Sequence, residues 1–201
     1  MKVSRDLWFF RLGMNTHVTF TRRMKRRLTR RAVIMLEAAL RQFPELDGKK
    51  ITIGHTRAHL GSALLPRRPA PEAKLTIRLK VRKLTYNTIG HELIHLAQWL
   101  SRQSAGAARI PGGEKQCDVW TLARSRLFCD DAPGYLKLPR AVRENWPKHA
   151  ASVRALCIAA IRKRKTHRFY LKWLEAEIKQ LGRRPLSDAS GRKQLSLPWD
   201  G

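Results

Sequence analysis

Hydrophobic and polar residues alternate most regularly over residues 75–81. The apolar residues occupy every second position and would share one side, so the stretch predicts a strand with one buried face. A shorter strand is expected around Ile51 and Ile53. Three prolines make regular structure improbable over residues 62–73, where we expect a loop.

Helical spacing of apolar residues predicts most of the remaining elements. Four stretches have this spacing and predict five helices: residues 21–43, 86–102, 114–128 and, as two helices, 140–182. Pro44 is expected to end the first helix, and Thr85 or Asn87 to cap the second. Glycine and proline indicate loops at residues 103–113 and 130–138.

The order of these elements, one helix, two strands and then helices, predicts an α+β fold. It would be mostly helical, with a small sheet beside the helix at 86–102. Residues 1–182 are expected to form a single domain with a core at about 50–128 and basic helical flanks. Residues 183–201 have the composition of a flexible tail.

The sequence His91-Glu92-Leu93-Ile94-His95 falls inside the predicted helix at 86–102. Residues four apart lie one turn above each other on a helix, so His91 and His95 can direct two imidazoles at one metal ion. Zinc is the metal that this arrangement favours. Glu92 is close enough to act as general base on a water molecule that the metal activates. The alternative is a surface helix that carries two histidines without a metal.

A catalytic zinc needs a third protein ligand and one open position. The nearest carboxylates after His95 are Glu114 and Asp118, which are four residues apart and would share one helix face. One can bind the metal while the other accepts a hydrogen bond from a ligand histidine. Glu114 also has a structural explanation, because a helix N-terminus favours an acidic residue.

The HExxH motif followed by Glu114 and Asp118 resembles the gluzincin metallopeptidases, whose second helix carries ExxxD. The resemblance implies a zincin-like core, with Glu114 as third ligand and Asp118 as the carboxylate that orients a histidine. It covers residues 75–128, about a quarter of the chain, and extends to minimal gluzincins and ImmA/IrrE-type peptidases. SprT-like proteases are more distant, because they use a third histidine soon after the motif that this chain lacks.

A peptidase also needs a group that stabilises the oxyanion. Tyr135, in a Pro-Gly-Tyr segment, is the first candidate for this transition-state stabiliser, and His149, Tyr170 or an arginine remain alternatives. The other four histidines carry no motif and are expected at the surface or in packing: His17, His55, His59 and His167. Three cysteines without a CxxC pair are expected to be buried and reduced.

The chain carries 42 Lys and Arg against 15 Asp and Glu, a net charge of +27 spread over its whole length. Such a field attracts polyanions, of which nucleic acid is the commonest in a cell. Two basic clusters without acidic residues are the candidates for non-specific phosphate contacts. They are Arg22, Arg23, Lys25, Arg26, Arg27, Arg30 and Arg31, and Arg162, Lys163, Arg164 and Lys165.

Neither a membrane span nor a signal peptide is expected, and the cytoplasm, including the nucleoid, is the predicted location. Three functions remain open. The first is a zinc-dependent metallopeptidase, a hydrolase that cleaves proteins near nucleic acid. The second is a non-catalytic, basic nucleic-acid-binding protein with a structural zinc site. The third is a metal hydrolase that acts on a non-protein amide.

Overall fold

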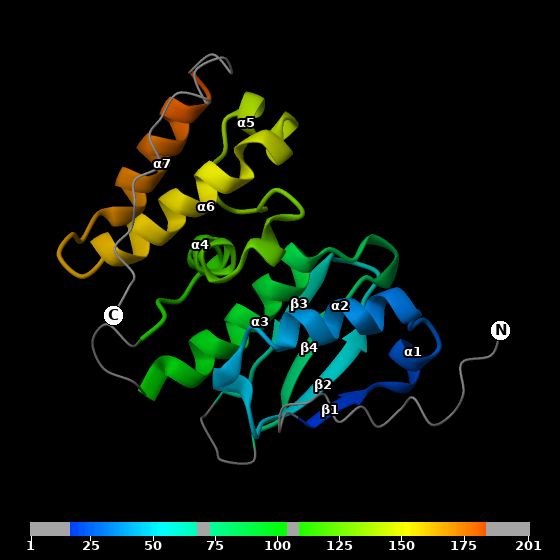
Figure 1. Cartoon of the computed structure of the whole chain (residues 1–201). Coiled ribbons are helices and arrows are strands. Elements are labelled where there is room, and N and C mark those ends of the chain that lie inside the picture. The colour runs from blue at the N-terminus through cyan, green and yellow to red at the C-terminus, as the bar shows by residue number, and fades with distance from the viewer. Residues whose placement is uncertain (1–16, 68–72, 104–108, 184–201) are drawn as a thin grey trace, which may run out of the picture.

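A computed structural model describes residues 17–67, 73–103 and 109–183. Helices α2 (Arg30–Leu40) and α3 (Tyr86–Leu100) cover one face of a small sheet (Figure 1). Beyond α3 lie α4 (Glu114–Arg124), α5 (Arg140–Glu144), α6 (Trp146–Lys163) and α7 (Tyr170–Leu181). The predicted α+β fold class is therefore confirmed. The predicted tail begins at residue 183, and its residues 184–201 lie outside the described part of the chain.

The sheet has four strands in the order β1-β2-β4-β3. Their bounds are β1 His17–Phe20, β2 Lys50–His55, β3 Gly61–Leu64 and β4 Leu75–Leu79. The pairs β1–β2 and β2–β4 are parallel, and β3 runs antiparallel to β4 with Ala63 opposite Ile77. The apolar side of β2 and β4, including Ile53 and Ile77, is buried against the helices, as the alternation predicts.

The sequence-based prediction is wrong for two of these strands. Strand β3 occupies part of the expected loop at 62–73, because it ends before the first proline and takes its hydrogen bonds from β4. Strand β1 is not predicted at all, since four residues give too short a pattern. Strand β4 ends at Leu79, and Val81 belongs to a 3-10 turn, η3 (Val81–Lys83).

The predicted helix at 21–43 is two helices, α1 (Arg22–Lys25) and α2. Each begins at a threonine whose hydroxyl accepts a backbone hydrogen bond: Thr21 from Met24, and Thr29 from Ala32. Threonine favours a cap over a helix interior, so the second cap interrupts what the apolar spacing alone treats as continuous. A 3-10 turn, η2 (Pro44–Leu46), follows α2.

Helix α3 carries the HExxH sequence and is held at its N-terminus by two separate caps. The Thr85 hydroxyl accepts from the Thr88 N–H, which confirms Thr85 as the N-cap. The Asp130 carboxylate, distant in sequence, accepts from the N–H groups of Tyr86 and Asn87 at 2.7 and 2.8 Å. These bonds satisfy donors that the first helical turn cannot pair internally.

Two hydrophobic clusters form the interior, and α4 belongs to both. The first lies between the sheet, α2 and α3, and it includes Cys117 of α4. The second joins α4, α6 and α7 and includes Val119 and Leu122. Helix α4 ends at Arg124 and not at Phe128, because Ser125 starts a 3-10 turn, η6 (Arg126–Cys129). The region 140–182 holds the two long helices expected there, preceded by the short α5.

Among the described residues, no helix combines the length and the apolar character needed to cross a membrane.

Replacing Asp130 by alanine is expected to lower the free energy of unfolding by about 1–2 kcal/mol, because two N–H groups of α3 lose their acceptor. Urea denaturation followed by circular dichroism measures this. Asp131→Ala, which removes the adjacent exposed carboxylate, is the matched control and should change stability by less than about 0.5 kcal/mol. Equal stabilities of the two variants would contradict the capping role.

Candidate metal centre

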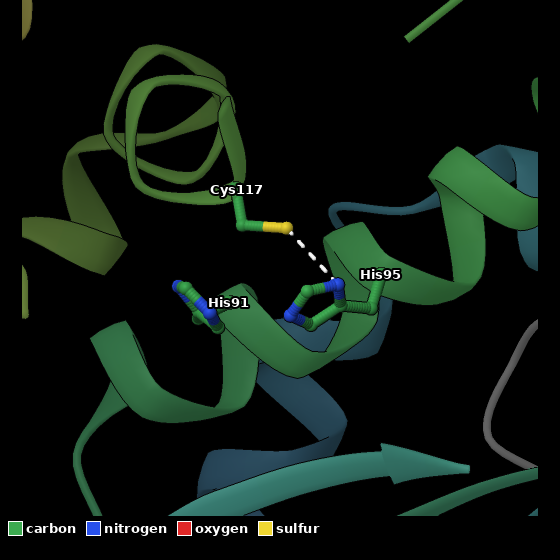
Figure 2. A group of neighbouring side chains, drawn as sticks. All are labelled: His91, His95 and Cys117. Atoms are coloured by element: carbon green, nitrogen blue, oxygen red, sulfur yellow. Dashed lines mark hydrogen bonds between the residues drawn. The ribbon is translucent and has the colours of Figure 1, made fainter. Parts of the chain in front are cut away.

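His91 and His95 point from α3 toward the first turn of α4 (Figure 2). His91 is buried and His95 half-buried. The Nε2 atoms of both rings lie beside the same oxygen, Glu114 Oε2, at 2.9 Å for His91 and 3.2 Å for His95. Three potential metal-binding atoms from two helices thus converge on one point.

Glu114 owes its position to the loop before α4. The helix starts directly after Gly113, whose φ of +104° is unfavourable for residues with a side chain. The side-chain amide of Gln98, one turn beyond His95 on α3, donates to the carbonyl of Pro111 at 2.6 Å. This bond ties the start of α4 to the helix that carries both histidines.

The Nδ1 atom of His91 donates to Asp118 Oδ1 at 2.8 Å. The second oxygen of Asp118 accepts from the backbone N–H groups of Tyr135 and Leu136 at 2.6 and 2.7 Å. With the proton fixed on Nδ1, the Nε2 atom of neutral His91 presents a lone pair toward Glu114. Two acceptors then face each other, and a proton or a metal cation between them makes this contact favourable.

The direction of the pKa shifts agrees with this geometry. Burial lowers the pKa of His91, but the hydrogen bond and charge of Asp118, with help from Glu114, outweigh it and the net pKa is raised. Burial lowers the pKa of His95, and the charge of His91 adds to this effect. Burial opposes ionisation of Glu114, yet its hydrogen bond to His91 leaves the pKa of Glu114 below its ordinary value.

His91, His95 and Cys117 form a group that could hold a metal ion, with one donor atom of each residue within 4.8 Å of the others. From the sequence alone, Cys117 is expected only to be a small buried residue. The feature that could have identified Cys117 as a candidate ligand is its position, three residues after Glu114 and one before Asp118. Its Sγ lies 3.2 Å from Nδ1 of His95 (Figure 2).

Two candidate ligand sets therefore share His91 and His95, one completed by Cys117 and one by Glu114. The carboxylate of Glu114 lies at the Nε2 side of both rings, where both lone pairs can meet one cation. The sulfur of Cys117 lies at the opposite, Nδ1 side of His95. Burial also raises the pKa of the Cys117 thiol above its ordinary value. We therefore favour Glu114.

Glu92 lies beside this centre and is buried. Among the described residues, its Oε2 has no hydrogen-bond partner. Burial raises the pKa of Glu92 to about 7, against the opposing charge of His91. Gly61 of β3 packs so closely on it that a Cβ atom there would lie 2.5 Å from Glu92 Oε1.

A cavity of about 710 Å³ opens above these side chains. Its walls come from the 58–65 segment, α3, the start of α4 and the loop at 131–135. The cavity is lined by four acidic residues, Glu92, Glu114, Asp118 and Asp131. The predicted metal ligands and the predicted general base, Glu92, therefore line one cavity together with Asp118.

Tyr135 also lines this cavity, with its ring stacked on His91 at a centroid distance of 5.4 Å. The other oxyanion candidates do not line it. His149 lies on α6, and the buried Tyr170 donates its hydroxyl to Gln116 at 2.6 Å. His59, which carries no sequence motif, contributes to the cavity rim.

The two basic clusters lie at opposite ends of the molecule, one on α1 and the start of α2, the other where α6 turns into α7 (Figure 1). Of the eleven predicted phosphate-contacting residues in the two clusters, eight are exposed and three are half-buried. The half-buried ones are Arg27, Lys163 and Arg164. Neither cluster lines the cavity.

Zinc is expected to raise the melting temperature, because the folded protein alone brings the donors of α3 and α4 together. At a free zinc concentration about 100-fold above Kd, the gain is about 2.7 kcal/mol. Differential scanning fluorimetry over a zinc titration, reversed by a chelator, measures it. Magnesium at the same concentration is the control and should have little effect, because imidazole is a poor ligand for it. A melting temperature indifferent to zinc would contradict the site.

Comparison of the chain with protein-family models, curated proteins and solved structures finds no match. The likeness to gluzincins therefore rests on the sequence motif alone. What this centre can do follows from the side chains that form it: two imidazoles and a carboxylate in contact, and a second carboxylate beside them in an open cavity.

Proposed function

We propose that the protein is a zinc-dependent peptidase, with His91, His95 and Glu114 as metal ligands and Glu92 as general base. One observation carries the proposal: the Nε2 atoms of both histidines and a Glu114 oxygen converge beside the unpaired Oε2 of Glu92. All four residues line the same cavity.

The donor set suits zinc better than other common cations. Two imidazoles with one carboxylate are a typical ligand set of catalytic zinc, whereas magnesium and calcium prefer oxygen ligands. Asp118 completes the arrangement, because it fixes the tautomer of His91 and holds the ring in place. A zinc ion bound here would supply Lewis-acid activation of water and of the scissile carbonyl.

Glu92 is positioned to move protons. Its carboxylate would take a proton from the attacking water and deliver it to the leaving nitrogen, as a general base and then a general acid. A base must reach its proton without being held by other groups, and Oε2 has no partner among the described residues. Tyr135, whose ring stacks on His91, is the proposed donor to the developing oxyanion.

Strand β3 favours an extended peptide as the substrate. One edge of β3 pairs with β4, and among the described residues no strand pairs with its other edge. Gly61, Ser62 and Ala63 of this strand line the cavity next to Glu92. A peptide that added to the sheet through main-chain hydrogen bonds would lie across the cavity. Because main-chain hydrogen bonds do not depend on the side chains of the peptide, strand addition would accept substrates of many sequences.

The alternatives of a structural zinc site and of a non-protein amide substrate fit these observations less well. A structural zinc is enclosed by four protein ligands, whereas these three candidate ligands border an open cavity. A small amide would leave the free edge of β3 unused. Both alternatives are distinguished from a peptidase by the first of the following experiments.

Glu92→Gln is expected to lower kcat for peptide cleavage by about 10²- to 10⁴-fold, because the amide cannot accept the proton. Zinc content should stay unchanged. Cleavage of quenched fluorescent peptides and of unfolded casein measures the rate, and elemental analysis measures the metal. Glu37→Gln, the same exchange on the half-buried face of α2, is the control and should leave both unchanged. Equal rates in parent and Glu92→Gln would contradict the proposal, as would the absence of any cleavage by the parent.

Gly61→Ala is expected to slow cleavage while leaving zinc binding and melting temperature close to those of the parent. The added methyl group would collide with the movable end of the Glu92 side chain, so the carboxylate shifts while the fold is kept. Gly134→Ala is the control in the same cavity, because a Cβ there meets nothing within 4 Å. A Gly61→Ala protein as active as the control would show that Glu92 does not need this position.

A further inference from the structure

The turn between α6 and α7 concentrates positive charge on a short part of the surface. From Glu144 to Glu175 the chain contains eight Lys and Arg residues and no Asp or Glu between these two. The end of α6 and the turn are mostly exposed, with Arg162, Lys165 and Arg168 at the surface. A helix C-terminus favours cations, which accounts for Arg162 but not for Arg168 beyond the helix.

An exposed phenylalanine stands in the middle of this charge. Phe169 is 54% exposed although it is a large hydrophobic side chain. The Arg168 guanidinium lies 5.8 Å and the Lys172 ammonium 5.1 Å from the centre of its ring. The ring offers a surface for base stacking, and the cations over it are available for phosphate, which are the two kinds of contact that single-strand-binding surfaces combine.

Contacts between α7 and α4 fix the position of the backbone next to Phe169. Tyr170, the next residue, is buried and donates its hydroxyl to Gln116 of α4 at 2.6 Å. One turn further along α7, Glu175 pairs with Lys115 of α4 at 2.7 Å. Because α7 is anchored, the ring is held outward before any partner arrives, and little ordering is needed on binding.

The surface suits single-stranded nucleic acid better than a duplex. In a duplex the bases are stacked on each other, so only phosphates are available to such a patch. In a single strand, the faces of the bases can stack on an exposed ring while phosphates meet the cations. The basic cluster on α1 and α2 differs, because its exposed large hydrophobic side chain is Ile34, which has no ring.

We propose that the α6–α7 turn binds single-stranded nucleic acid, with a base stacked on Phe169 and phosphates held by Arg162, Lys165 and Arg168. This activity goes beyond the proposed peptidase and does not depend on it. Stacking and phosphate contacts are independent of base sequence, so binding is without strong sequence preference.

Fluorescence anisotropy with labelled 20-residue dT and U oligonucleotides tests the proposal on the full chain. Phe169→Leu keeps the charge and an apolar side chain but removes the ring, and it should weaken single-strand binding by about 5- to 100-fold. Phe169→Trp keeps an aromatic ring and should bind the single strand about as tightly as the parent does. Ile34→Ala, at an exposed position of the other basic cluster, is the matched control and should bind as the parent does. Binding of dT and U alike is expected, and a preference between them identifies DNA or RNA as the partner.

The charge is tested by the double variant Lys165→Gln with Arg168→Gln, against Arg41→Gln with Lys74→Gln at exposed positions elsewhere. The first double variant should lower the slope of log affinity against log salt by about 1.4, the value for two lost single-strand phosphate contacts. The control should change it by less. Melting temperatures establish that each variant is folded, and Phe169 and the charged residues are exposed enough for this to be expected.

Three results would overturn the proposal. The first is equal single-strand affinity of Phe169→Leu and the parent. The second is a 20-base-pair duplex that binds more tightly than the single strand at equal salt. The third is binding to vesicles of phosphatidylserine and phosphatidylcholine that depends on Phe169, without oligonucleotide binding, which would assign the turn to a membrane surface.

Discussion

The candidate centre depends on one buried carboxylate, that of Asp118. Its side chain is 1% exposed and accepts three hydrogen bonds, from His91 Nδ1 and from the backbone of Tyr135 and Leu136. A carboxylate without such partners would be costly to bury, so its hydrogen bonds and its position are established together. These hydrogen bonds fix α3, α4 and the loop that carries Tyr135 relative to one another.

The site also lies where the two hydrophobic clusters meet. Helix α4 contributes Cys117 to the cluster beneath the sheet and Val119 to the cluster of C-terminal helices, and Trp120 packs against both. Gly90 of α3 allows close packing, because a Cβ there would lie 2.7 Å from the Phe128 ring. A metal bound between α3 and α4 would therefore join the two halves of the interior.

The parts of the fold that depend on local sequence could be predicted, and those that depend on distant partners could not. The bounds of α3 and its Thr85 cap follow from spacing and a capping residue, and the four-residue separation places Glu114 and Asp118 on one face of α4. Strand β3 has almost no pattern of its own and exists because β4 offers it an edge. The second cap on α3 comes from Asp130, more than 40 residues away in the chain, and no local rule could identify it. The contact of Cys117 with His95 likewise depends on how α4 packs on α3.

The four acidic residues that line the cavity belong to a chain whose net charge is +27. The cavity therefore gathers acidic side chains within a strongly basic chain. The net positive charge of the chain repels a divalent cation that approaches from solution, and only the carboxylates of the cavity attract it. Its entry is therefore expected to be slower at low ionic strength and faster in salt, which screens the repulsion. An acidic polypeptide would meet these charges in the reverse order: the basic chain would attract it, and the carboxylates of the cavity would repel its acidic side chains.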